Sequence, residues 1–166
     1  MKYVPSLCLV LLMMLSCECG LERTNRTTHT SSKTFKTYAE KMEFLSRYLV
    51  NQAGLLDAEY EIDYQDNSGN GRTIPGPSDW DMRMVLRVVP DSLNAWTGEG
   101  KRQEFAISHE LWKGLASDSL WKAISTPVLF TEPGMVKLIH RPEGIVLAYY
   151  TTTPVELEKY KLNLPE

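Results

Sequence analysis

Residues 58–64 alternate without a fault between apolar and polar side chains, and only an extended strand sorts such a pattern onto two faces. One face receives Tyr60, Ile62 and Tyr64, and the other receives Glu59, Glu61 and Asp63. Because successive side chains of a strand point to opposite sides, the pattern predicts a strand with one buried and one polar face. This part of the chain therefore belongs to a sheet.

Residues 80–89 alternate in the same way and predict a second half-buried strand, which Pro90 ends because proline has no amide hydrogen for a ladder. The inward set is Trp80, Met82, Met84, Leu86 and Val88, and the outward set includes Asp81, Arg83 and Arg87. If the two strands pair antiparallel, acidic and basic residues face one another, which stabilises by about 0.2 to 1 kcal/mol per pair. The acidic run is thus expected to be structural.

Helical signals flank these strands. Thr37 and Glu40 have the spacing of a capping box, and apolar residues recur at helical intervals until Gly54, which predicts one amphipathic helix over 36–53. Short helices are predicted over 91–96, with Asp91 as cap, and over 117–124. Residues 98–115 give no clear pattern.

A hairpin is predicted near the end of the chain, with strands over 135–140 and 145–152. Its turn, residues 141–144, has Pro at the second position and Gly at the fourth. The expected fold is α+β: a mainly antiparallel sheet of about four to five strands, covered by one long N-terminal helix, with additional short helices. With 166 residues, the chain has room for one such domain, expected over 34–166.

The N-terminus has the composition of an export signal. Lys2 precedes an apolar run of about a dozen residues, Val4 to Leu15, which is shorter than the roughly 20 residues that a membrane-spanning helix needs. The sequence Met14-Leu15-Ser16-Cys17 then resembles the lipobox of bacterial lipoproteins, a resemblance that covers only about the first 20 residues. It implies a signal peptide over 1–16 and acylation of the Cys17 sulfur, for example with palmitate. The alternative is an ordinary signal peptide.

The resemblance also implies a location. A lipidated Cys17 would hold the protein to a membrane of the cell envelope, and Glu18 favours the outer over the inner membrane, since it stands where an inner-membrane retention signal would have Asp. Residues 17–33 are rich in Thr and Ser and nearly devoid of apolar side chains after Leu21. We therefore expect a flexible tether between the anchor and the domain.

Composition excludes several classes of function. The net charge of −3 offers no basic footprint for nucleic acid. All three cysteines lie within the first 19 residues, so the predicted domain has neither disulfide nor thiol chemistry. No cofactor motif and no metal-ligand cluster is present in the sequence, and His29, His109 and His140 are widely separated. Lys113 occupies the place where a zinc-protease helix beginning at His109 would need its second histidine.

The segment between the first two predicted strands is the best candidate for a contact surface, because long Gly- and Pro-rich loops on a rigid sheet are common binding sites. The candidate contact residues are Asp66, Asn67, Asn70, Arg72, Asp79, Trp80 and Asp81. Part of this loop imitates the opening of an EF-hand calcium loop, but Pro77 stands where the closing Glu should be. A plain turn is the favoured interpretation.

These observations favour a lipid-anchored, non-enzymatic binding module of the envelope over an enzyme. An envelope protein or peptidoglycan is the expected partner, and small size and export also fit an immunity lipoprotein. The alternative is a small envelope hydrolase that uses Asp or Glu side chains. Its candidate residues are Asp79, Asp81 and Glu110, assisted by His109 or His140. A concave pocket that gathers two carboxylates would favour the hydrolase, and exposed aromatic side chains would favour the binding module.

Overall fold

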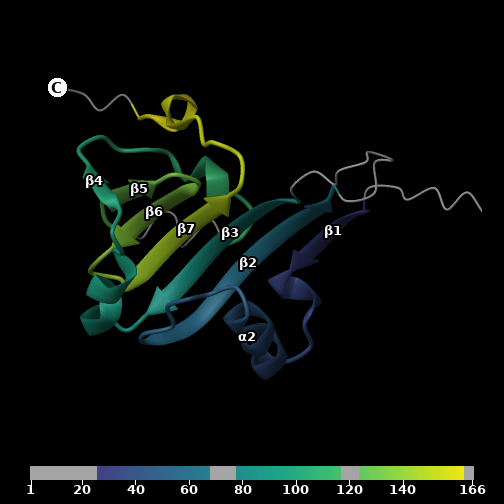
Figure 1. Ribbon diagram of the computed structural model, residues 1–166. Helices are drawn as coiled ribbons and strands as arrows, with labels where there is room; N and C mark the ends of the chain where they lie inside the picture. The colour runs from purple at the N-terminus through teal and green to yellow at the C-terminus, as the bar shows by residue number, and fades with distance from the viewer. Residues whose placement is uncertain (1–25, 68–77, 117–123, 163–166) are drawn as a thin grey trace, which may run out of the picture.

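A seven-stranded antiparallel sheet forms the body of the computed structural model, which describes residues 26–67, 78–116 and 124–162 (Figure 1). The strands lie in the order β1-β2-β3-β7-β6-β5-β4. Their bounds are Arg26–Ser31 for β1, Leu55–Asp66 for β2, Asp79–Val88 for β3, Lys101–Gln103 for β4, Val128–Glu132 for β5, Met135–His140 for β6 and Ile145–Thr151 for β7. The expectation of four to five strands was therefore wrong.

Short helices accompany the sheet. The α-helix α2 covers Tyr38–Ser46, and the 3₁₀ helices are η1 (Ser32–Thr34), η2 (Pro90–Trp96), η3 (His109–Trp112) and η4 (Leu157–Tyr160). None of the helices in the described residues is long and apolar enough to cross a membrane. The short helix expected over 117–124 lies almost entirely outside the described residues.

The long covering helix predicted over 36–53 is also wrong, because α2 has only nine residues. Its start is as expected: Thr37 accepts from the backbone amide of Glu40, and the Glu40 carboxylate accepts from the amide of Thr37. Its end comes early. Asn51 accepts from the amide of Ala53 and donates to a carbonyl of η2, and such side-chain bonds to backbone compete with helical ones.

The two long strands β2 and β3 confirm the alternation in the sequence. Tyr60 pairs with Met84, Ile62 with Met82 and Tyr64 with Trp80. We call the side of the sheet that carries these residues the α2 face, because α2 packs there: Leu45 is buried against it and the Tyr60 hydroxyl donates to the Lys41 carbonyl. Glu59, Glu61 and Asp63 of β2 point to the other side.

Apolar side chains cover both sides of the sheet, and not only the side of the predicted helix. The core on the α2 face includes Met84, Leu86 and Trp96, while a second core lies on the opposite side, which we call the η3 face. There, Trp112 packs among residues that include Leu138 and Leu147 of β6 and β7. The inner strands β6 and β7 are largely buried on both faces, so each face needs a cover.

The β6–β7 hairpin is confirmed, and Gly144 in its turn has a φ of +65°, which favours glycine. Residues 98–115, which gave no pattern, contain β4 and η3. At the opposite edge, residues 26–31 of the expected tether form β1, which pairs with β2 over its whole length. Threonine favours extended structure, and β2 offers it an edge to pair with.

Candidate functional site

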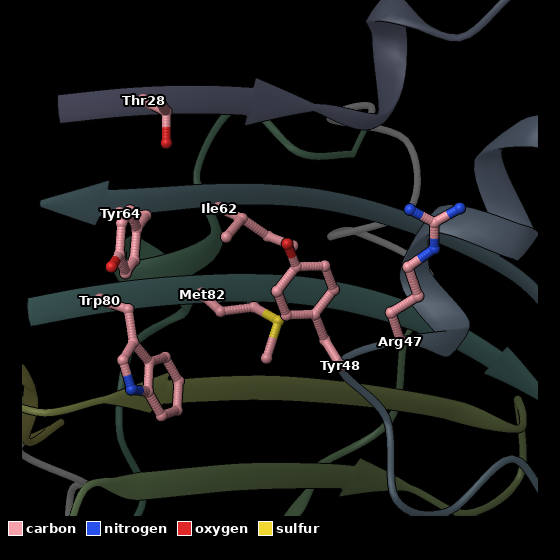
Figure 2. A pocket seen from close by; sticks show the side chains of 7 residues that line it. All are labelled: Thr28, Arg47, Tyr48, Ile62, Tyr64, Trp80 and Met82. Atoms are coloured by element: carbon pink, nitrogen blue, oxygen red, sulfur yellow. The ribbon is translucent and has the colours of Figure 1, made fainter. Parts of the chain in front are cut away.

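A pocket of about 540 Å³ opens on the α2 face, over strands β1 to β3. Seven side chains line it: Thr28, Arg47, Tyr48, Ile62, Tyr64, Trp80 and Met82. Figure 2 shows how three neighbouring strands supply the floor, while Arg47 and Tyr48 come from the turn that follows α2. The lining is therefore mainly apolar and aromatic, with one cation.

The floor of the pocket follows from strand register. Thr28 of β1 is level with Tyr64 of β2, and Tyr64 is level with Trp80 of β3. One step along, Ile62 is level with Met82. Because residues two apart on a strand share a face, these rows of side chains all point to the α2 side.

The wall of the pocket exists because α2 ends at Ser46. The amide of Tyr48 donates to the carbonyl of Leu45 in a tight turn, and its ring lies 5.3 Å from that of Phe44. The Arg47 guanidinium lies 3.2 Å from the Glu43 carboxylate, one helical turn back. This turn places a tyrosine and a guanidinium beside the sheet.

Three aromatic side chains of the pocket are exposed to water. Tyr48 is 47% exposed, Tyr64 41% and Trp80 37%. Hydrogen bonds help to hold two of them: the Tyr64 hydroxyl donates to Ser78 at 3.0 Å, and the Trp80 amide donates to the Thr152 hydroxyl at 3.1 Å. A gathering of solvated aromatic faces in a concavity is typical of a contact site, since an apolar occupant would displace water from all three at once.

Of the five predicted contact residues that the structure describes, one, Trp80, lines this pocket. Asp66 ends β2, and Asn67 donates to the Asp79 carboxylate at 2.9 Å, which joins the two ends of the predicted loop. Asp81 points to the η3 face, two residues on from Asp79 along β3. Asn70 and Arg72 lie outside the described residues.

The sequence interpretation missed the other six lining residues: Thr28, Arg47, Tyr48, Ile62, Tyr64 and Met82. Thr28 lies in the segment expected to be a tether, and Arg47 and Tyr48 lie within the expected long helix. The inward-facing Tyr64, assigned to the core, was the one available signal, because its hydroxyl needs a polar partner or water.

On the η3 face, Asp81 belongs to a polar row across the sheet. It accepts a hydrogen bond from the Tyr149 hydroxyl and lies 3.8 Å from Arg83, while Asp63, level with it on β2, bonds to His29 at 2.7 Å. Burial raises the pKa of Asp81, and the Asp63 charge adds to this, whereas Tyr149 and Arg83 oppose it. Burial likewise raises the pKa of Tyr149 to about 12, so it stays a donor.

The residues proposed for a hydrolase are not brought together. Asp79 and Asp81 lie at the start of β3, whereas His140 is level with the far end of that strand, about 20 Å away at the rise of a strand. Glu110 is exposed and paired with a nearby lysine. Among residues 26–67, 78–116 and 124–162, no group of three or more His, Cys, Asp or Glu side chains is arranged to hold a metal ion.

The two histidines, in contrast, do meet. The rings of His109 and His140 lie 5.4 Å apart beneath the η3 face, and His140 Nδ1 donates to the Ser125 carbonyl at 2.6 Å. Burial lowers the pKa of both, and for His140 the bond to Ser125 opposes this. Both lowered pKa values favour the neutral form of the two imidazole rings at pH 7.

Comparison with known proteins identifies no relative: no protein-family model, no curated protein and no solved structure matches this chain. Its function must therefore be inferred from the geometry of its own residues.

Proposed function

We propose that this chain is a lipid-anchored binding module of the bacterial cell envelope, and that the aromatic pocket on the α2 face is its binding surface. The observation that carries the proposal is the gathering of Tyr48, Tyr64 and Trp80, all substantially exposed, around one concavity of about 540 Å³. Burying such rings is the main source of affinity at many interfaces.

Rigidity of the surroundings supports the same proposal. The pocket floor belongs to a sheet with a packed core on each face, so its side chains are held in place before an occupant arrives. Preorganised sites lose less conformational entropy on binding than mobile ones. This favours recognition of a defined partner.

The proposed anchor adds a constraint on where the partner lies. β1 begins at Arg26, about nine residues after Cys17, and Thr28 of the pocket follows directly. Nine residues span at most about 30 Å, even when the chain is fully extended. If Cys17 carries lipid, the pocket works close to a membrane surface, where an envelope protein or peptidoglycan is the available partner.

The proposal is tested by comparing pull-downs from detergent-solubilised envelopes with the parent, Trp80→Ser and Tyr38→Ser. Tyr38 is the matched control: it is an exposed tyrosine of α2 that does not line the pocket. After thermal melts show that all three are folded, we expect Trp80→Ser to lose a partner that Tyr38→Ser retains. Equal recovery by Trp80→Ser and the parent would reject the pocket.

The anchor is tested separately by labelling cells with radioactive palmitate. We expect the parent to incorporate label and to fractionate with membranes, and Cys17→Ser to do neither. Maturation and membrane association of Cys17→Ser as in the parent would remove the lipid from the proposal, but would leave the pocket untouched.

A further inference from the structure

The two outer strands of the sheet differ in how they are protected. β4 has three residues and presents the exposed cations Lys101 and Arg102. Short length and charge are devices by which edge strands avoid pairing with other chains. β1 has six residues, and after Arg26 it contains no lysine, arginine or proline; its register with β2 is continuous, without a bulge. The β1 edge lacks the protection that the β4 edge has.

The outer edge of β1 is accessible to another strand. Thr27, Thr28 and His29 are exposed, and within the described residues β1 has a strand neighbour on one side only, β2. Alternate amide and carbonyl groups of an edge strand point away from the sheet, and another extended chain can satisfy them. In Figure 1, β1 lies at the margin of the sheet, beside β2.

This edge is continuous with the pocket. Thr28 and Thr30 are level with Tyr64 and Ile62, so they share the α2 face, and Thr28 lines the pocket itself. A strand added beside β1 would lie about 4.8 Å further out, with every second side chain on the α2 face. Such a side chain, if large, reaches over Thr28 into the pocket.

We propose that an extended segment of a partner protein adds to β1 as an outer strand and inserts an apolar or aromatic side chain into the aromatic pocket. This inference rests on the proposed function and names the kind of partner. Backbone bonds to β1 supply affinity without regard to sequence, and the pocket selects the side chain.

A second copy of this chain fits less well as the occupant. Pairing of β1 with β1 of another copy would bring every second residue of β1 to the α2 face, and none of the residues of β1 is a large apolar one that could fill a pocket of about 540 Å³. The apolar lining, with Ile62 and Met82 in its floor, calls for a larger apolar group.

The test uses the full chain in detergent micelles and a phage-displayed library of random 12-residue peptides. We expect enrichment of linear peptides with a large apolar or aromatic residue, and binding of the selected peptide at least ten-fold weaker to Trp80→Ser than to the parent. Arg102→Ala, a change at the protected edge, is the matched control and should bind as the parent does.

Amide hydrogen exchange reads the strand pairing directly. Every second amide of β1 points away from β2. In the complex, these outward amides should exchange at least ten-fold more slowly than in the unbound chain. Successive amides of a strand point to opposite edges, so the amides of Thr27 and Thr30 point to opposite edges of β1. Thr27→Pro and Thr30→Pro each remove one amide hydrogen, and only the variant whose lost amide points away from β2 should keep the melting temperature of the parent. It should bind at least ten-fold more weakly.

The outcomes separate the two proposals. Binding that depends on Trp80 without slower exchange in β1 would overturn strand addition and leave the pocket. Binding that does not depend on Trp80 would overturn both. Failure of the library to enrich any peptide, or a stable dimer that protects the same amides of β1, would overturn the partner-segment inference.

Discussion

Replacing Trp112 by phenylalanine tests whether the η3 face is packed as described. Trp112 is fully buried, and its indole Nε1 donates to the Ala148 carbonyl at 2.9 Å. The change removes this bond and leaves a buried acceptor one partner short, which costs about 1 kcal/mol. The smaller ring also leaves a void, for which about 1 to 2 kcal/mol is expected after partial relaxation. The expected loss is therefore about 2 to 3 kcal/mol.

This loss is measured as a shift in the melting temperature followed by far-ultraviolet circular dichroism. For a domain of this size, 1 kcal/mol corresponds to about 3 to 5 °C, so Trp112→Phe should melt about 6 to 15 °C below the parent. Trp80→Phe is the matched control, because Trp80 is partly exposed and a phenyl ring still covers Met82; it should stay within about 2 °C. A Trp112→Phe shift as small as that of the control would refute the packing of η3 on the sheet.

Two further predictions concern the same domain. Gly144→Ala should lower the urea midpoint and cost at least about 2 kcal/mol of unfolding free energy, because φ is +65° and an added Cβ would press on the Val88 carbonyl oxygen. An unchanged midpoint would contradict the backbone conformation described for this turn. The free energy of unfolding should fall as the pH drops below about 6.5, because the folded-state pKa values of His109 and His140 lie below the unfolded value and the unfolded chain therefore binds more protons. The slope is at most about 1.4 kcal/mol per pH unit for each histidine. Urea titrations between pH 5 and 8 should show that the unfolding free energy of His140→Asn, which keeps a donor for Ser125, depends less steeply on pH than that of the parent. Identical slopes for the two proteins would exclude His140 as a source of the pH dependence.

The strands that could be predicted from the sequence are mainly those with one face buried and the other face polar. Residues 58–64 and 80–89 alternate because one face of β2 and β3 is buried and the other is largely polar, and the β6–β7 hairpin has a turn with its own chemistry. Strands β1, β4 and β5 lack such signals. Each forms because a neighbour offers a backbone edge, which is a tertiary effect that local sequence does not report.

The length of the helix was mispredicted for a related reason. Apolar spacing continues past Ser46 to Leu49, but Leu49 is buried from a non-helical turn, and Asn51 satisfies the backbone in that turn. The pocket depends on this early end. The alternation could place Tyr64 and Trp80 on one face, but the contribution of Arg47 and Tyr48 required the position at which α2 stops.

The central claim, that the aromatic pocket contacts a partner in the envelope, is tested most directly by photocrosslinking in intact cells. The photoreactive residue p-benzoylphenylalanine is placed at Tyr48, in the turn after α2 that lines the pocket, or at Tyr38, at the start of α2 and outside the pocket. We expect a discrete adduct from position 48 that is lost on adding Trp80→Ser, and no such adduct from position 38. Identical adducts from both positions, or an adduct at 48 that persists with Trp80→Ser, would contradict the account.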